Sequence, residues 1–494
     1  MAVVILSIGL LVFLSHLLTG VFQRTRVPDV LVLMLAGIVI GPALHLVRPD
    51  DFGKVGPVFT TLALIVILFE GGIHLSIREL GSAARDTLFI SLASFVFTVL
   101  ALAYLADAFL PVEPLTALLI GTILGGTSSA VVVPMIRILR MSRLPGTVLM
   151  LESALTDVLA VVLSLGLMRA LEPGADASLT APALALTITQ AFLIAALIGV
   201  AGAFVWSAIL PRVREIPNTV FTTIAYVLIL FGVTEWLGYS GAIAALTFGI
   251  GVANLPLIPE RLLGRIISFR LVGFAEVERT VFAETVFLVK TFFFVYLGIS
   301  ITFGDWPSVL AGVTLVLTAF AGRLVMVRLL APRSFTRRDA MLTTALIPKG
   351  LAAAVLASLP LQRGLPDGVV IQDTVYAVIF FSIVGSATLV FLIEAGLLDR
   401  VAARLFAPFA PAPASAGADE RPVAPFQHSI GLPAIVKDVE EPNLVRFDGE
   451  KRPTRSADPP SGAPPDPPAS PPPTEPMAPP DTPTHPDPAD PERP

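Results

Sequence analysis

Long apolar stretches follow one another along most of this chain, separated by short polar loops. A helix that crosses a bilayer needs about 20 mostly apolar residues, and the pattern predicts thirteen such spans. They lie at residues 2–22, 27–44, 56–75, 87–109, 114–136, 145–169, 181–210, 219–237, 240–254, 284–304, 307–331, 339–360 and 371–397. The pattern therefore predicts an all-α polytopic membrane protein, with a membrane domain over residues 1–404.

The composition agrees with a membrane protein. The chain has 494 residues, of which 54% are hydrophobic and 14% charged, whereas soluble proteins carry about 25% charged residues. The absence of cysteine excludes disulfide scaffolds and thiol catalysis, and the five histidines argue against a His-rich metal site. A net charge of −5 without a long basic run gives no indication of nucleic-acid binding.

Basic residues in the loops predict how the spans are oriented. The loops after odd-numbered spans hold most of them, for example Arg137, Arg140 and Arg143 after the fifth span, whereas the loops after even-numbered spans hold few, such as Arg48 and Lys54. Cytoplasmic loops are enriched in Lys and Arg. We therefore expect a multi-pass protein of the inner cell membrane, with the N-terminus outside and the C-terminus in the cytoplasm.

Residues 405–494 differ in composition from the rest of the chain. From residue 453 onward they are rich in proline, with Asp, Ser, Thr and Glu between the prolines. Such a stretch cannot bury a core, so we expect a disordered cytoplasmic tail with local polyproline II structure. Residues 426–448 are more apolar and could dock as one short segment, on a partner or as an autoinhibitory contact.

Seven ionisable residues lie within predicted spans, where a charge at mid-bilayer costs about 2.5–3.5 kcal/mol. They are Glu70, Glu152, Asp157, Glu235, Lys290, Arg323 and Lys349. In the sixth span, Ser153 and Asp157 are one turn apart and share a face, whereas Glu152 and Asp157 are about 140° apart and cannot point at one site. One carboxylate can then face a pathway while the other faces a neighbouring helix. We expect Arg323 to be the partner of Glu152, which leaves Asp157 for the pathway; a structural ion pair of Asp157 is the alternative.

Two spans carry helix-breaking residues in their middle. The fifth contains Gly125-Gly126-Thr127-Ser128-Ser129, and the twelfth contains Ile347-Pro348-Lys349-Gly350. Broken helices occur in membranes only where the freed backbone lines a cavity or is buried in protein. One break in each half of the chain indicates an inverted-repeat transporter with its site where the segments cross. Lys349 could neutralise helix C-terminal ends there; a proline kink with small-residue packing is the alternative.

Three polar positions near span ends are interpreted less directly. His74, one turn after Glu70, is expected to cap a helix at the interface, with pH sensing as the alternative. Glu235 is expected to be interfacial. The run 238–241 (GYSG) matches the G-x-S-G of rhomboid-type intramembrane serine proteases. That mechanism needs a histidine base, and no histidine lies in a later span, so we interpret the run as a tight turn.

Eight stretches together resemble the monovalent cation:proton antiporters, in the branch of NhaP-like antiporters and sodium/proton exchangers. They are VPDVLVLMLAGIVIGP (27–42), LFEGG (68–72), GGTSSAVVVP (125–134), ESALTD (152–157), EWLGYSGAIAA (235–245), TFFFVYLGI (291–299), GRLVMV (322–327) and PKGLAAAVLASLP (348–360). They follow the family's order through almost all of residues 1–400.

The resemblance implies a homodimer in which spans 1–3 and 7–10 form the dimer scaffold and spans 4–6 and 11–13 the moving core. It makes Asp157 the residue that binds cation and proton in turn. It implies cation ligands at Ser153, Thr127 and Glu70, with Ser128 and Thr156 beside them. It also implies a structural ion pair of Glu152 with Arg323, and charge compensation by Lys349. The roles of Lys290, Glu235 and His74 stay open. The family often has Asp at position 128 and Asn or Asp at position 156.

We therefore expect a secondary antiporter that exchanges Na⁺ or K⁺ for H⁺ by alternating access, with no cofactor and no enzymatic activity. A hard monovalent cation suits carboxylate, hydroxyl and carbonyl oxygens. The resemblance implies two adjacent aspartates in the sixth span of electrogenic members and one in electroneutral members. Here the neighbour of Asp157 is Thr156, which cannot ionise near neutral pH, so we expect electroneutral one-for-one exchange. A second proton carried by Glu70, or one lost from Lys290, is the alternative. A symporter or channel on a related fold stays open as an alternative, and an intramembrane protease as a remote one.

Overall fold

The computed structural model describes residues 28–52, 55–75, 85–172, 181–216, 221–255, 276–301 and 306–410, together with a few isolated residues between 9 and 17. All of them belong to the first of two compact units, Met1–Pro433. Most of the predicted first span lies outside the described residues. The expected disorder over 453–494 and the expected docking of 426–448 lie outside them as well.

The described chain is helical, which confirms the all-α prediction. Its helices are α2 (Asp29–Ile38, continued by a π turn, Val39–Ala43), α3 (Val55–His74), α5 (Arg85–Phe109), α6 (Pro114–Ile123), α7 (Ser129–Ile138), α8 (Arg143–Leu171), α9 (Ala181–Val213), α10 (Thr222–Trp236), α11 (Gly241–Asn254), α13 (Glu276–Ser300), α14 (Trp306–Leu330), α15 (Arg337–Ala345), α16 (Leu351–Gln362), α17 (Gly368–Glu394) and α18 (Asp399–Leu405), with a 3-10 turn at Pro49–Phe52. Within the described part, the one β feature is an isolated bridge between Thr336 and Ala410.

Among the described residues, six helices are long and apolar enough to cross a membrane. They are Phe89–Phe109, Arg143–Leu171, Thr189–Val213, Thr280–Ser300, Trp306–Leu330 and Gly368–Glu394. The other apolar helices are shorter: some are halves of broken spans, and α10 and α11 are separated by a turn at residues 237–240. The protein is therefore a multi-pass membrane protein, while the count of thirteen spans stays a prediction.

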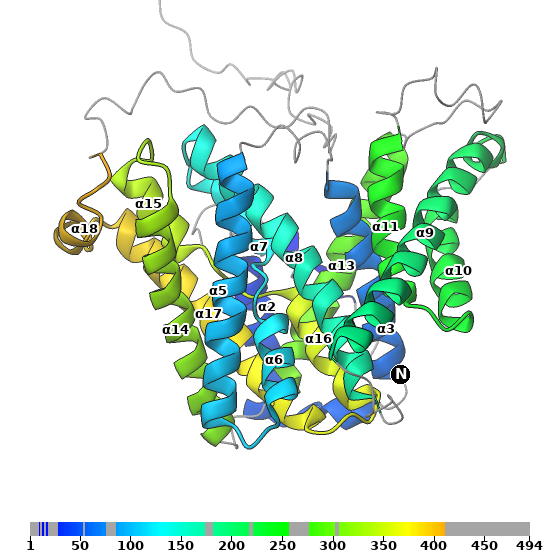
Figure 1. The fold of residues 1–494 in the computed structure, drawn as a ribbon, viewed down its shortest axis with the longest axis horizontal. Coiled ribbons are helices and arrows are strands. Elements are labelled where there is room, and N and C mark those ends of the chain that lie inside the picture. Colours follow the sequence, from blue (N-terminus) through cyan, green and yellow to red (C-terminus); the bar gives the residue numbers. More distant parts are fainter. Residues whose placement is uncertain are drawn as a thin grey trace, which may run out of the picture. The chain divides into compact units, whose positions relative to one another are not determined.

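Both predicted breaks are present. The fifth span is interrupted between α6 and α7, and the twelfth between α15 and α16. Figure 1 shows α6 and α16 at one end of the bundle and α7 and α15 at the other, so the two broken spans run in opposite directions. Each lies between two continuous helices, α5 and α8 in one case and α14 and α17 in the other. This arrangement is that of an inverted repeat.

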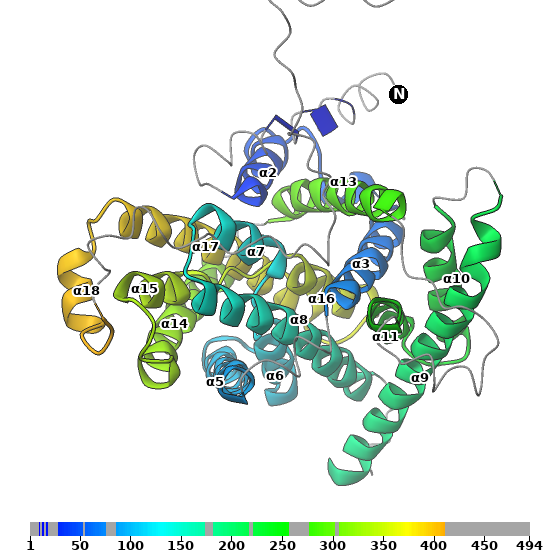
Figure 2. The same cartoon turned by 90° about the horizontal axis from the view of Figure 1, so that it is seen from above.

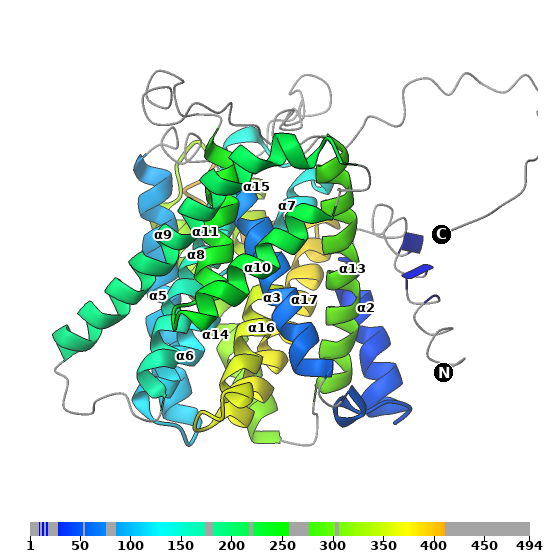
Figure 3. The same cartoon turned by 90° about the vertical axis from the view of Figure 1, so that its right-hand side faces the viewer.

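The helices pack in two groups that meet along a few elements (Figure 2). The broken-helix group comprises α5–α8 and α14–α17, which contact one another extensively. The α3 group comprises α3 with α9, α10 and α11, and the adjoining pair α2 and α13, which lie side by side in Figure 3. The two groups meet mainly where α3 contacts α16, with smaller contacts of α8 with α9 and α3, of α13 with α16 and of α2 with α17.

Glycines set the closest helix crossings. In the α3 group, a Cβ added at Gly72 of α3 would lie 2.2 Å from the Leu246 carbonyl oxygen of α11, and Gly249 of α11 faces it. Gly37 of α2 and Gly298 of α13 approach one another in the same way. Tight contacts of this kind also occur in the broken-helix group, for example between Gly121 and α5. Each close approach by a glycine of the described chain joins helices of one group, never helices of both.

The packed domain extends past the predicted boundary at residue 404. Phe406 and Phe409 are buried, and the carbonyl oxygen of Ala410 accepts a 2.7 Å hydrogen bond from the backbone N–H of Arg337, at the start of α15. The Arg333 guanidinium lies 5.4 Å from the centre of the Phe409 ring. The segment that follows α17 is therefore fastened to the broken-helix group as far as residue 410.

The crossing of α3 and α11 gives a stability prediction with a built-in control. We expect Gly72→Ala to destabilise the protein by about 1–3 kcal/mol, the usual cost of overpacking, because its Cβ would meet backbone atoms of α11. Gly71→Ala should be neutral, since a Cβ at that position meets nothing within 4 Å. Thermal unfolding of both variants in detergent tests this. Equal midpoints for the two variants would contradict the proposed contact.

Candidate functional site

The two unwound segments cross one another in direct backbone contact. The N–H of Ser128 donates to the carbonyl oxygen of Pro348 at 2.9 Å. A Cβ added at Gly350 would lie 2.1 Å from Ser128 Oγ, so a larger residue at position 350 would push the segments apart. The breaks thus satisfy part of each other's hydrogen-bonding need, as buried backbone requires.

Lys349 occupies the crossing and is 2% exposed. Its Nζ donates to the carbonyl oxygen of Gly126 at 2.9 Å, and its backbone N–H donates to Ser382 Oγ on α17 at 2.9 Å. Gly126 lies just after the C-terminal end of α6, where helix carbonyls carry partial negative charge. The geometry is that of the predicted charge compensation.

Asp157, on α8, lies at the beginning of the second half-helix. Its Oδ2 accepts hydrogen bonds from Ser129 Oγ (2.8 Å) and from the Ser129 backbone N–H (3.2 Å). Ser129 is the first residue of α7, so the carboxylate accepts the first N–H of this helix and lies at the positive end of its dipole. A Cβ added at Gly126 would lie 3.4 Å from Asp157 Oδ1, so unwound backbone lies beside the other oxygen. Asp157 and Ser129 are partly exposed.

The hydroxyl residues next to Asp157 are buried and bonded to the backbone. Thr156 Oγ1 accepts from the N–H of Thr127 at 3.2 Å and donates to the carbonyl oxygen of Ser153 at 3.3 Å. Ser153 Oγ donates to the carbonyl oxygen of Met150 at 3.0 Å. The structure therefore brings Thr127, Thr156 and Asp157 together where α8 meets the first break. It directs the Ser153 hydroxyl hydrogen back to its own helix.

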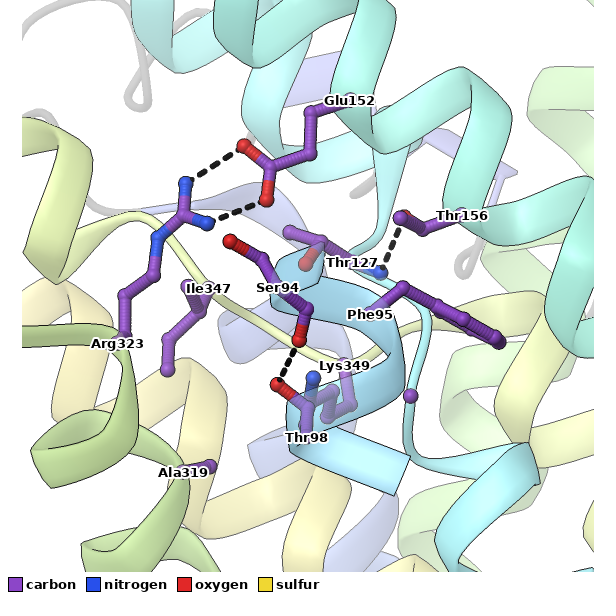
Figure 4. A pocket seen from close by; sticks show the side chains of 11 residues that line it. Ser94, Phe95, Thr98, Thr127, Glu152, Thr156, Ala319, Arg323, Ile347 and Lys349 are labelled. Carbon is purple, nitrogen blue, oxygen red and sulfur yellow. Dashed lines mark hydrogen bonds and ion pairs between the residues drawn. The ribbon is translucent and has the colours of Figure 1, made fainter. Parts of the chain in front are cut away.

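Glu152 and Arg323 form a bidentate ion pair, as the sequence predicted. Both guanidinium NH₂ groups donate to the two carboxylate oxygens, one of them at 2.7 Å, and Arg323 Nε donates to the carbonyl oxygen of Thr343 at 3.2 Å. The side chains are 3% and 7% exposed. Figure 4 shows the pair beside Thr127 and Thr156. The pair ties α8 to α14 and to the first half of the second broken helix.

A small cavity of about 20 Å³ lies against this ion pair (Figure 4). It is lined by Ser94, Phe95, Thr98, Gly125, Thr127, Glu152, Thr156, Ala319, Arg323, Ile347 and Lys349. That volume suits a single water molecule. Asp157 is not among the lining residues, which agrees with its position on a different face of α8 from Glu152.

Glu70 and Lys290 form a second ion pair, between α3 and α13. Lys290 Nζ lies 3.2 Å from Glu70 Oε1, and the two side chains are 24% and 22% exposed. Both residues belong to the α3 group, whereas Asp157 belongs to the broken-helix group. The structure thus pairs Glu70, which the resemblance makes a cation ligand, with a residue that had no settled role.

The remaining candidates cap helices or end them. Glu235 is exposed, and its Oε1 accepts the N–H of the first residue of α11 at 2.8 Å. Ser240 is the N-cap of the same helix, and its Oγ accepts the N–H of Ile243 at 3.4 Å. The run 238–241 is a turn with a helix cap, as expected. His74 is the last residue of α3, and its side chain lies outside the described residues.

Two residues of the site were not predicted. Ser129 appeared in the sequence only as part of a polar run, although its place directly after the two glycines and two hydroxyl residues puts it at a helix start. Ser382 lies within an apolar helix, and nothing in the local sequence distinguishes it from a packing residue. It becomes visible only because Lys349 donates to it.

With this geometry established, comparison with known proteins identifies the family. Residues 9–395 match the family model described as sodium/hydrogen exchanger, transmembrane. The chain belongs to this family. Two named antiporters are similar to it: the K(+)/H(+) antiporter NhaP2 of Shewanella sp. (strain MR-4), 25% identical over 407 residues, and the Na(+)/H(+)-K(+) antiporter GerN of Bacillus cereus, 25% identical over 378 residues.

The coverage differs between these relatives. The match to NhaP2 covers 80% of this chain and 66% of the relative, so the chain spans slightly less than two thirds of that protein's length. The match to GerN covers 75% of this chain and 90% of the relative. The solved structure of the sodium proton antiporter MjNhaP1 from Methanocaldococcus jannaschii at pH 8 has the same fold, with a TM-score of 0.62, 19% identity and coverage of 78% of this chain and 98% of that one.

The buried ion pair gives a prediction about stability. Glu152→Met or Arg323→Met alone should destabilise the protein by about 3–5 kcal/mol, because each leaves a buried charge without its partner. The double variant Glu152→Met/Arg323→Met should recover much of that loss, since it leaves neither charge. Thermal unfolding in detergent measures all three variants. A double variant less stable than either single one would contradict this account.

Proposed function

We propose that this protein is a secondary antiporter that exchanges a monovalent cation for protons by alternating access, with Asp157 as the shared binding site. The observation that carries the proposal is a partly exposed carboxylate held by Ser129 at the crossing of two broken helices. When ionised, Asp157 binds a cation; when protonated, it returns without one. Competition of two ions for one carboxylate is sufficient to couple their fluxes.

The cation would be coordinated by oxygen ligands around Asp157. Ser129 Oγ is bonded to the carboxylate, and the unwound backbone at Gly126 lies beside its other oxygen. Thr127, Ser153, Ser128 and Thr156 would supply further oxygen ligands. Such ligands suit Na⁺ and K⁺ alike. One similar protein is named a K(+)/H(+) antiporter and another a Na(+)/H(+)-K(+) antiporter, so we propose exchange of Na⁺ or K⁺.

The two helix groups have different proposed roles. The broken-helix group carries Asp157 and would move as the core, while the α3 group would form a fixed scaffold and the contact of a homodimer. Packing supports this division, because helices contact others of their own group more extensively than helices of the other. From the distribution of loop arginines we propose an inner-membrane location with the C-terminus in the cytoplasm.

Asp157→Asn should abolish cation-driven proton flux, because an amide neither titrates nor neutralises a cation. The protein should remain folded, since the amide oxygen can still accept the Ser129 hydrogen bonds. Proteoliposomes loaded with a pH-sensitive dye and given Li⁺, Na⁺, K⁺ or Rb⁺ in turn provide the measurement.

The matched control is Asp107→Asn, which removes a carboxylate from an exposed position near the end of α5 and should transport normally. Robust exchange by folded Asp157→Asn protein would contradict the proposed site. A cation current without proton movement in the native protein would indicate a channel. Cation and proton moving in the same direction would indicate a symporter.

The charges at the site also predict the stoichiometry. Thr156, the neighbour of Asp157, cannot ionise, so one carboxylate releases one proton for each monovalent cation that it takes up. We expect electroneutral exchange. Clamping the membrane potential with potassium and valinomycin should leave the rate of Na⁺-driven proton movement unchanged. Faster turnover under the clamp would show that a second group joins the proton count.

A further inference from the structure

The cavity beside the Glu152–Arg323 ion pair contains a polar group that the proposed transport site does not use. This group is the hydroxyl of Ser94, which lies on α5 and lines the cavity. Its Oγ is buried and has no hydrogen-bond partner among the described residues. Because buried polar side-chain atoms are nearly always hydrogen-bonded, the Ser94 hydroxyl indicates that a partner from outside the chain occupies this place.

Other hydroxyls of the broken-helix group bond within their own helices. Thr98 Oγ1 donates to the carbonyl oxygen of Ser94 at 2.8 Å. In the same way, Thr122 Oγ1 donates to the carbonyl oxygen of Leu118 at 2.7 Å. A helical serine can bond back to its own helix too, but Ser94 does not. Figure 4 shows its side chain directed toward the Glu152–Arg323 pair, so its bonding capacity is turned into the cavity.

The cavity has the size and the lining of a water site. Its volume is about 20 Å³, whereas about 10–15 Å³ is enough for one water molecule with two to four polar partners. Ser94 Oγ is one such partner, and the Glu152 carboxylate and the Lys349 ammonium line the same cavity. A carboxylate accepts up to about four hydrogen bonds, and an ammonium has three donors, of which Lys349 uses one on the Gly126 carbonyl oxygen.

The charges of the lining favour a neutral ligand. Arg323 and Lys349 would repel a cation in this cavity, and the Glu152 carboxylate would repel an anion. A molecule that both donates and accepts hydrogen bonds matches a hydroxyl, a carboxylate and an ammonium at once. Water is such a molecule, and it is small enough.

We propose that this cavity binds one ordered water molecule, held by the Ser94 hydroxyl together with the Glu152 carboxylate and the Lys349 ammonium. The water connects α5 to α8 and to the second break, three elements that meet at the ion pair. It is not a ligand of the transported cation, because Asp157 does not line the cavity. The site therefore does not depend on the proposed antiport function.

The direct test is a density map of the full-length native protein in nanodiscs, at a resolution where other internal waters are visible. We expect a peak about 2.5–3.2 Å from Ser94 Oγ. A native map without that peak overturns the proposal. Crystals grown with Rb⁺ and Br⁻ separate water from an ion, because water gives no anomalous signal. An anomalous peak in the cavity would show a bound ion and would overturn the proposal as well.

Ser94→Ala tests the hydroxyl, and Ser164→Ala is the matched control. Ser164, on α8, is also a buried helical serine whose Oγ has no partner among the described residues, but it does not line this cavity. Both variants gain the same helix propensity, so the difference between them reports the hydroxyl. We expect the thermal unfolding midpoint of Ser94→Ala to lie about 1–3 °C below that of Ser164→Ala, since only Ser94 loses a bond to water.

The water peak should weaken or disappear in Ser94→Ala and persist in Ser164→Ala. An unchanged peak in Ser94→Ala, or a midpoint equal to or above that of Ser164→Ala, would overturn the role of Ser94. If Ser94→Ala does not fold, the native map decides alone. Absence of exchange by the native protein would refute the antiport function and leave the water site standing.

Discussion

The need to satisfy backbone groups freed in the middle of two apolar spans governs this structure. In the hydrocarbon region no water replaces a lost helical hydrogen bond, so each break has to be repaired by protein. Here the two breaks repair each other through the bond from Ser128 to Pro348 and through the Lys349 ammonium on the Gly126 carbonyl. These bonds do not use the backbone N–H of Ser129 at the start of α7, and this N–H donates to the Asp157 carboxylate.

The two carboxylates of α8, Glu152 and Asp157, lie in different surroundings. Glu152 is almost completely buried and bound at both oxygens by Arg323, so its charge is neutralised within an ion pair that connects α8, α14 and α15. Asp157, five residues later, lies on another face, is bonded by neutral donors of Ser129 and stays partly exposed. A carboxylate without a cationic partner in contact keeps its attraction for a mobile ion. The helical period therefore separates a structural charge from an exchangeable one.

Much of the candidate site could be predicted from the sequence, because its signals are local. Gly125-Gly126 and Pro348 mark the breaks by their poor helix-forming tendency, and charges in apolar spans are rare enough to be noticed individually. The pairing of Glu152 with Arg323 followed from having few possible partners. By contrast, the contact of Lys290 with Glu70 joins residues 220 positions apart, and Ser382 resembles any small residue in an apolar helix. Such contacts depend on how helices pack, which no local pattern encodes.

The glycine contacts described above have a mechanical consequence. Where two helices touch through glycines, their backbones are in direct contact, so one helix cannot slide along the other without the two first moving apart. All such contacts in the described chain join helices of one group: Gly72 with α11 and Gly37 with α13 in the α3 group, and Gly121 with α5 in the broken-helix group. Among the described residues, no glycine makes such a contact across the boundary between the groups. The proposed movement of one group relative to the other would therefore leave all of these close contacts intact.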